Sequence, residues 1–158
     1  MNARSVAIVL SVLTCSCGAE TDNAGLDLES ADDDFKGCPE LSARFEPGLQ
    51  AKGEHFALTL VSAMPTEPER YLNSWTIEVE ALNGASAADA KLERSQTFMP
   101  IHGHDGRVVP EISAAAKPGQ FDVERMNFSM RGPWEVRFWL SSSTLGEDYV
   151  VFHVCVAK

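Results

Sequence analysis

One short segment of the chain carries side chains that could bind a metal ion. Residues 98–106 read Phe-Met-Pro-Ile-His-Gly-His-Asp-Gly, which places a methionine at position 99 and histidines at positions 102 and 104. In an extended loop, His102 and His104 project to the same side. Imidazole suits copper and zinc, whereas a thioether selects Cu(I), so Met99, His102 and His104 together predict a copper site.

The same residue types also allow a purely structural interpretation. Gly103 and Gly106 could supply positive φ angles to an ordinary exposed turn. Two further methionines, Met126 and Met130, alternate with Phe128 along the chain, so we expect them to pack in the core and not to bind metal.

Patterns typical of catalysis are not found in the sequence. The run 141–144 (Ser-Ser-Ser-Thr) lacks the Gly-x-Ser-x-Gly pattern of a nucleophilic serine, and Glu78 and Glu80 are expected on one solvated strand face. A zinc hydrolase would need a third firm ligand and a general base beside the two histidines. We therefore expect that the protein is not an enzyme.

The N-terminus has the pattern of an export signal. Arg4 precedes the apolar run 5–14, which is too short to span a bilayer as a helix. Cys15 and Cys17 follow, as in a bacterial lipoprotein signal. Cleavage before Cys17 places the small Ser16 at the −1 position, so residues 1–17 are interpreted as the signal peptide with Cys17 as the lipidated anchor. Cys15 is the alternative acceptor, and ordinary secretion or a core helix are the alternative interpretations.

Residues 18–37 are expected to form a disordered acidic linker. They contain seven acidic residues and one lysine, with almost no aromatic or β-branched residues, so they cannot bury enough surface to fold. A flexible chain of this length would hold a domain roughly 25 Å from the membrane. The whole chain carries a formal charge of −10, which argues against nucleic acid as a partner because phosphate binding needs a basic surface.

The remaining residues, 38–158, are expected to form one all-β domain. Apolar residues alternate with polar ones along several segments separated by Gly- and Pro-containing turns, and the period slips near Arg125. The segment 149–156 is apolar on both faces, which predicts a central strand. About seven short strands at near-regular spacing predict an immunoglobulin-like antiparallel β-sandwich. The expected strands are 55–62, 74–81, 121–128, 134–141 and 149–156, with weaker ones at 90–97 and 107–112.

Two cysteines remain within this domain. Cys38 precedes the first strand and Cys155 lies on the last. Cysteines of exported proteins usually pair, so a Cys38–Cys155 disulfide is predicted. Metal-binding or redox-active thiolates are the alternative.

The region from Phe98 to Val156 resembles the YtkA-like domain family, which is related to the FixH-type proteins. The resemblance is carried by Met99-Pro-Ile-His-Gly-His104, by the stretch from Gly119 to Met130, by Gly132-Pro-Trp134-Glu-Val136 and by a last strand from Asp148 to Val154. It implies a small exported or membrane-tethered β-sandwich domain, with a copper-handling or other envelope protein as partner. The implied metal residues are again Met99, His102 and His104.

Two functions follow from these observations. The first is a lipid-anchored protein of the bacterial cell envelope, facing the periplasm or the cell surface, that binds copper for delivery or sensing. The second is an envelope protein-interaction domain without metal. Its motivating residue is Trp139, which the strand alternation turns outward, because exposed aromatic residues often anchor partners.

Overall fold

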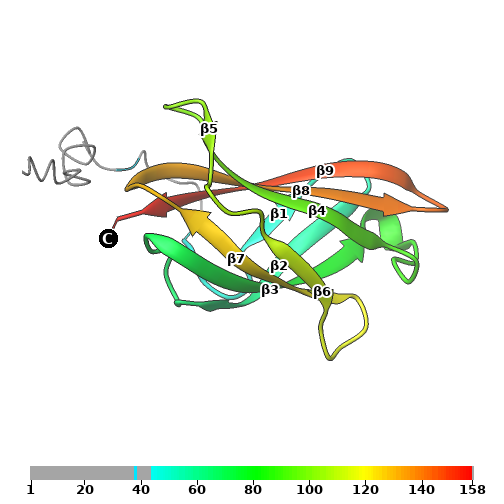
Figure 1. The fold of residues 1–158 in the computed structure, drawn as a ribbon. Helices are drawn as coiled ribbons and strands as arrows, with labels where there is room; N and C mark the ends of the chain where they lie inside the picture. Colours follow the sequence, from blue (N-terminus) through cyan, green and yellow to red (C-terminus); the bar gives the residue numbers. More distant parts are fainter. Residues whose placement is uncertain (1–37, 39–43, 158) are drawn as a thin grey trace, which may run out of the picture.

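A computed structural model describes residue 38 and residues 44–157 of the chain. These residues form two antiparallel sheets stacked in two layers, with the core between them (Figure 1). A 3₁₀ turn, η2 (Leu82–Gly84), follows β3. The five-stranded sheet has the spatial order β1 (Gln50–Lys52), β2 (Phe56–Met64), β3 (Tyr71–Ala81), β7 (Gln120–Phe128) and β6 (Glu111–Ala114). The four-stranded sheet has the order β5 (His104–Asp105), β4 (Lys91–Met99), β8 (Gly132–Ser142) and β9 (Gly146–Val156).

The predicted β-sandwich is therefore confirmed, and the inward-facing residues form its core. Along β8 the buried side chains are Trp134, Val136, Phe138 and Leu140, while the intervening residues are partly exposed, as the alternation predicts. Trp75 of β3 and Phe152 of β9 meet edge to face with ring centroids 5.9 Å apart. Contacts of this kind join the two sheets across the core.

Two expectations about individual strands were wrong. The last strand, β9, lies at the edge of the four-stranded sheet and not at its centre. Its outward side carries the exposed Tyr149 and His153 and the partly buried Val151, and β1 and β2 of the other sheet lie alongside it. The weak strand expected at 107–112 is largely a connection, because only its last two residues belong to β6.

The period slip near Arg125 is confirmed. Arg125 has a φ of 60°, which is rare for a residue other than glycine. In the pairing of β3 with β7, Asn73 faces Met126 whereas Trp75 faces Val123, so β7 holds an extra residue at this point. The bulge turns both Val123 and Met126 into the core although they are three positions apart.

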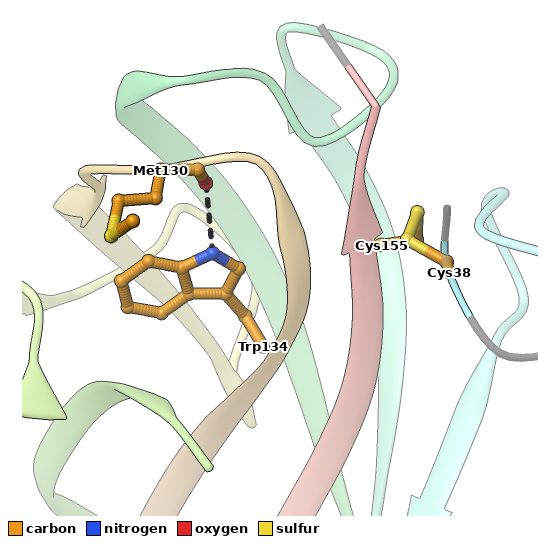
Figure 2. Close-up of a disulfide and its surroundings, with 4 residues drawn as sticks. All are labelled: Cys38, Met130, Trp134 and Cys155. Carbon is orange, nitrogen blue, oxygen red and sulfur yellow. Dashed lines mark hydrogen bonds between the residues drawn. A yellow bond between two sulfur atoms is a disulfide. The ribbon is translucent and has the colours of Figure 1, made fainter. Parts of the chain in front are cut away.

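The predicted disulfide is present. Cys38 is bonded to Cys155 of β9, with the two Cα atoms 5.8 Å apart, and the two residues are 117 positions apart in sequence (Figure 2). The bond ties the start of the described chain to its last strand.

Residues 1–17 and 18–37, with the predicted signal, the candidate lipidation sites Cys15 and Cys17 and the predicted linker, lie outside the described residues. Within residue 38 and residues 44–157, no helix is long and apolar enough to cross a membrane.

Candidate metal site at the β4–β5 hairpin

The two histidines of the predicted copper site lie on a tight hairpin between β4 and β5. The hairpin stands out from the two layers of the sandwich (Figure 1). Met99, the last residue of β4, is paired with His104, the first residue of β5. The backbone N–H groups of His102 and Gly103 both donate to the Met99 carbonyl, at 3.2 and 2.8 Å. Gly103 has a φ of 66°, as expected for a glycine that closes such a turn.

Gly106 fixes the base of the hairpin, but by a different property from the one expected. Its φ is not among the positive ones, so that expectation was wrong. Instead, the chain passes so close to its neighbours here that a Cβ atom would overlap the Thr97 hydroxyl and the Asn127 carbonyl. The Gly106 N–H donates to the Thr97 carbonyl at 2.8 Å, and the Thr97 hydroxyl donates to the Asn127 carbonyl at 2.9 Å. The hairpin is thereby attached to both sheets.

The structure brings the imidazoles of His102 and His104 together. Their ring centroids are 5.9 Å apart and their planes differ by 25°. His102 is exposed and His104 is half-buried. The Nδ1 atom of His104 lies 3.0 Å from the Asp105 carbonyl oxygen. Since a carbonyl only accepts hydrogen bonds, Nδ1 carries the proton, and the lone pair of this imidazole is on Nε2.

Trp134 supports His104 from the side of the core. The His104 and Trp134 rings meet edge to face with centroids 5.8 Å apart. The Trp134 indole N–H donates to the Met130 carbonyl at 3.0 Å, and the Met130 side chain lies beside the indole ring (Figure 2). The sequence predicted Trp134 only as a core residue. Its role beside His104 depends on a contact between residues 30 positions apart, for which the sequence pattern gives no signal.

Met99 is placed differently from the two histidines. Its side chain is 2% exposed and belongs to the core. A Cβ atom at Gly132 would lie 2.7 Å from the Met99 methyl carbon, so this methyl group packs against the start of β8. Because directly paired residues project from the same face of a ladder, Met99 and His104 share the inward face of the hairpin, whereas His102 lies at its exposed tip.

A survey of the described residues finds no group of three or more His, Cys, Asp or Glu side chains that could hold a metal ion. The predicted ligand set contains only two residues of these types, and its third member is a thioether.

A comparison with protein-family models places this hairpin within a known domain. The model described as YtkA-like matches residues 50–138, which is more than half of the chain. The chain belongs to the YtkA-like family. The match runs from β1 into β8 and includes Met99, His102, His104 and Trp134, while both cysteines of the disulfide lie outside it. Searches of curated proteins and of solved structures found no match.

Outside the hairpin, the YtkA-like domain places the remaining candidate residues as expected. Met126 is fully buried and Met130 packs partly against the core. Trp139 projects from the outer face of β8, where the Arg94 guanidinium lies 4.2 Å from the centroid of its ring system. The Tyr149 ring lies next to Trp139 on β9, with centroids 5.1 Å apart. The outward orientation predicted for Trp139 is confirmed.

Proposed function

We propose that this YtkA-like protein is an exported, lipid-anchored β-sandwich that binds a copper ion at the β4–β5 hairpin and delivers or senses it without catalysing a reaction. The observation that carries the proposal is the orientation of His104. Its Nδ1–H donates to the Asp105 carbonyl, which leaves the Nε2 lone pair as the donor atom. Metal-binding histidines commonly use their second ring nitrogen in this way.

The donor set favours copper over other metals. His102 lies beside His104, and two imidazoles with access to solvent suit either oxidation state of copper. Met99 would add a thioether, which is a soft ligand that favours Cu(I). Met99 is paired with His104 in the ladder, but its side chain packs against the start of β8, so it would have to turn from this packing to join an ion at His104. The copper ion would be bound and passed on, and it would take part in no catalysed reaction on this protein.

Two features support export and anchoring. Residues 1–17 have the sequence pattern of a lipoprotein signal with Cys17, or alternatively Cys15, as the lipid acceptor. The Cys38–Cys155 disulfide supports an oxidising compartment, because such bonds are rare in the cytosol. We therefore propose that the protein lies at the bacterial cell envelope, facing the periplasm or the cell surface.

The copper proposal is tested by titrating the purified, oxidised protein with Cu(I) and with Cu(II) against competing chelators. We expect one equivalent to bind with a dissociation constant below about 1 μM. The variant His102→Ala/His104→Ala should lose at least about tenfold in affinity, or about 1.4 kcal/mol. Met99→Leu should weaken Cu(I) binding more than Cu(II) binding.

The chain offers a matched control, because its other two histidines are not part of the hairpin. His55 precedes β2 and His153 is exposed on β9. The variant His55→Ala/His153→Ala removes the same number of imidazoles and should bind copper like the unmodified protein. Equal losses in the two double variants would contradict a site at the hairpin.

A second function, protein interaction without metal, is favoured by the outer face of β8. Trp139, Tyr149 and Arg94 form a connected surface cluster there, and these residue types are the ones that most often dominate binding energy in interfaces.

A further inference from the structure

A groove of about 700 Å³ lies on the outer surface of the four-stranded sheet, at the end where β8 turns into β9. Trp139 and Tyr149 contribute aromatic surface to it, from neighbouring positions on β8 and β9. Glu54 lines it from the β1–β2 turn, Glu93 from β4 and Glu147 from the start of β9. A groove of this volume is large enough for a side chain together with adjacent backbone.

The aromatic wall is suited to a cation. Tyr149 is 44% exposed, and its ring is tilted by 52° relative to the Trp139 ring. Arg94, which does not line the groove, places its guanidinium over the Trp139 ring. Because Arg94 already makes the cation–π contact with Trp139, the aromatic face that a ligand cation can use is the exposed ring of Tyr149.

The charges that line the groove all have the same sign. Glu54, Glu93, Glu147 and Asp148 are acidic, and no lysine or arginine is among the lining residues. Asp148 accepts hydrogen bonds from the backbone N–H groups of Glu54, His55, Phe56 and Tyr149 at 2.8–3.0 Å, so its charge is already compensated. The carboxylates of Glu54 and Glu147 have no hydrogen bond or ion pair within the described part of the chain and are therefore available to a ligand.

Asp148 also makes one wall of the groove rigid. Its hydrogen bonds hold the β1–β2 turn, including Glu54, against β9. The turn approaches so closely that a Cβ atom at Gly53 would overlap the Asp148 carboxylate. The backbone positions of Glu54 and Tyr149 are thereby fixed relative to each other, so less conformational entropy is lost when a ligand binds between them.

We propose that this groove binds an arginine side chain presented by an extended segment of a partner protein. The planar guanidinium can stack on an aromatic face and form paired hydrogen bonds with a carboxylate, which a compact ammonium group cannot do. The net negative lining supplies the charge complementarity for a basic partner.

The inference rests on the protein-interaction function proposed above and is independent of copper. The His hairpin packs near Trp134, at the beginning of β8, whereas the groove lies beside Trp139 near its end. Five residues of strand separate these two positions by roughly 17 Å. Changes in the groove should therefore leave copper binding unchanged.

The test uses the full oxidised chain and a fluorescein-labelled peptide, Gly-Gly-Arg-Leu-Arg-Gly-Gly, in anisotropy titrations at about 150 mM salt. A second peptide carries neutral citrulline in place of both arginines, which keeps shape and removes charge. We expect saturable binding of the arginine peptide and at least tenfold weaker binding of the citrulline peptide. Tyr149→Leu should weaken binding of the arginine peptide at least fivefold, because Tyr149 supplies the exposed aromatic face of the groove.

A pair of charge-matched variants separates the groove from general attraction to an acidic protein. Glu54→Gln/Glu147→Gln removes two charges from the groove and should weaken binding at least fivefold. Glu78→Gln/Glu80→Gln removes two charges from β3, in the other sheet, and should change affinity less than twofold. Both variants keep the acidic residues of 18–37, so attraction to that segment cancels in the comparison.

Four results would overturn the inference. The first is an equal effect of the two double variants. The second is no saturable binding of the arginine peptide below about 1 mM. The third is displacement of the peptide by tetramethylammonium at a concentration similar to that of the peptide, which would indicate a site for small organic cations. The fourth is tighter binding of the citrulline peptide than of the arginine peptide, which would reject the cationic ligand while leaving the protein-interaction function in place.

Discussion

At the scale of single residues, two aspartates hold connections together by accepting several hydrogen bonds each. Asp148 accepts four backbone N–H groups. Its partial burial acts to raise the pKa, but the hydrogen bonds outweigh burial, so the pKa is lowered from the ordinary value. Asp89, in the connection before β4, accepts from the hydroxyls of Ser142 and Ser143 and from the Ser143 N–H in the β8–β9 turn. These two carboxylates link segments that are far apart in sequence.

Asp89 gives a prediction about acid stability. Hydrogen bonds from the hydroxyls of Ser143 and Ser142 lower its pKa from 3.8 to about 2. A pKa lowered by folding means that the folded state favours the ionised form. Its stabilising effect is therefore complete above pH 4 and is lost as the pH falls from about 4 to about 2. Asp89→Asn should be less stable than the unmodified protein at pH 7, and the two should converge near pH 2.

Urea unfolding midpoints at pH 7, 4 and 2.5 measure this convergence. Ser143→Ala keeps the carboxylate but removes one donor, so its stability should show an intermediate dependence on pH. A constant difference between Asp89→Asn and the unmodified protein across the pH range would contradict the assignment.

The histidine pair shows how much of the candidate site can be predicted from sequence. The spacing of His102 and His104 is local, so a short pattern predicts correctly that their imidazoles lie together. The bond from His104 to the Asp105 carbonyl, the support from Trp134 and the burial of Met99 depend on tertiary packing. The sequence therefore predicts that the two histidines are neighbours, but not their orientation or their access to solvent.

At the scale of elements, strands can be predicted because the alternation of apolar and polar residues is a local property. Which strands become neighbours in a sheet cannot be predicted from this alternation. The alternation in β2, β3 and β8 gave strands at the expected places. The apolar outer face of β9 predicted a central strand, yet β9 is at an edge. Its outward Tyr149 packs beside Trp139, and β1 and β2 lie alongside the strand. Apolar residues on both faces thus reflect lateral contacts that the sequence pattern does not specify.

The contact between the β1–β2 turn and β9 leads to a prediction for Gly53→Ala. The new methyl group would overlap the Asp148 carboxylate and push it away from the N–H groups of His55 and Phe56. We expect a loss of about 1–3 kcal/mol in the free energy of unfolding, as is typical of steric overlap at a packed position. The measurement is the urea midpoint at pH 7, with an unchanged m value.

Lys52→Ala is the control for Gly53→Ala, since Lys52 is the exposed neighbour on β1 and its removal should change stability by less than about 0.5 kcal/mol. A Gly53→Ala protein as stable as this control would show that the turn can move away from β9. The turn would then not be the rigid wall of the groove.

At the scale of the whole molecule, the sandwich has chemically different features near opposite ends of β8. The His hairpin packs near the beginning of this strand, and the acidic aromatic groove lies near its end. The disulfide is at the same end as the hairpin, because Cys155 pairs with Pro133 across β8 and β9. The four-stranded sheet itself separates the inward contacts of the hairpin, which belong to the core, from the outer surface on which the groove lies.

The disulfide sets the last prediction, which concerns the stability of the entire domain. Cys38 and Cys155 close a loop that contains nearly all of the described chain, with a separation of 117 residues. In the chain-entropy model, closing a loop of this length removes conformational freedom from the unfolded state worth up to about 5 kcal/mol. Cys38→Ser/Cys155→Ser should therefore lower the free energy of unfolding by about 2–5 kcal/mol, measured by urea denaturation. The reduced unmodified protein should unfold at the same urea concentration as the double variant, because both lack the bond and retain the same core. A double variant as stable as the oxidised protein would show that the sandwich is stabilised by its packing alone and that the covalent link between Cys38 and β9 adds nothing.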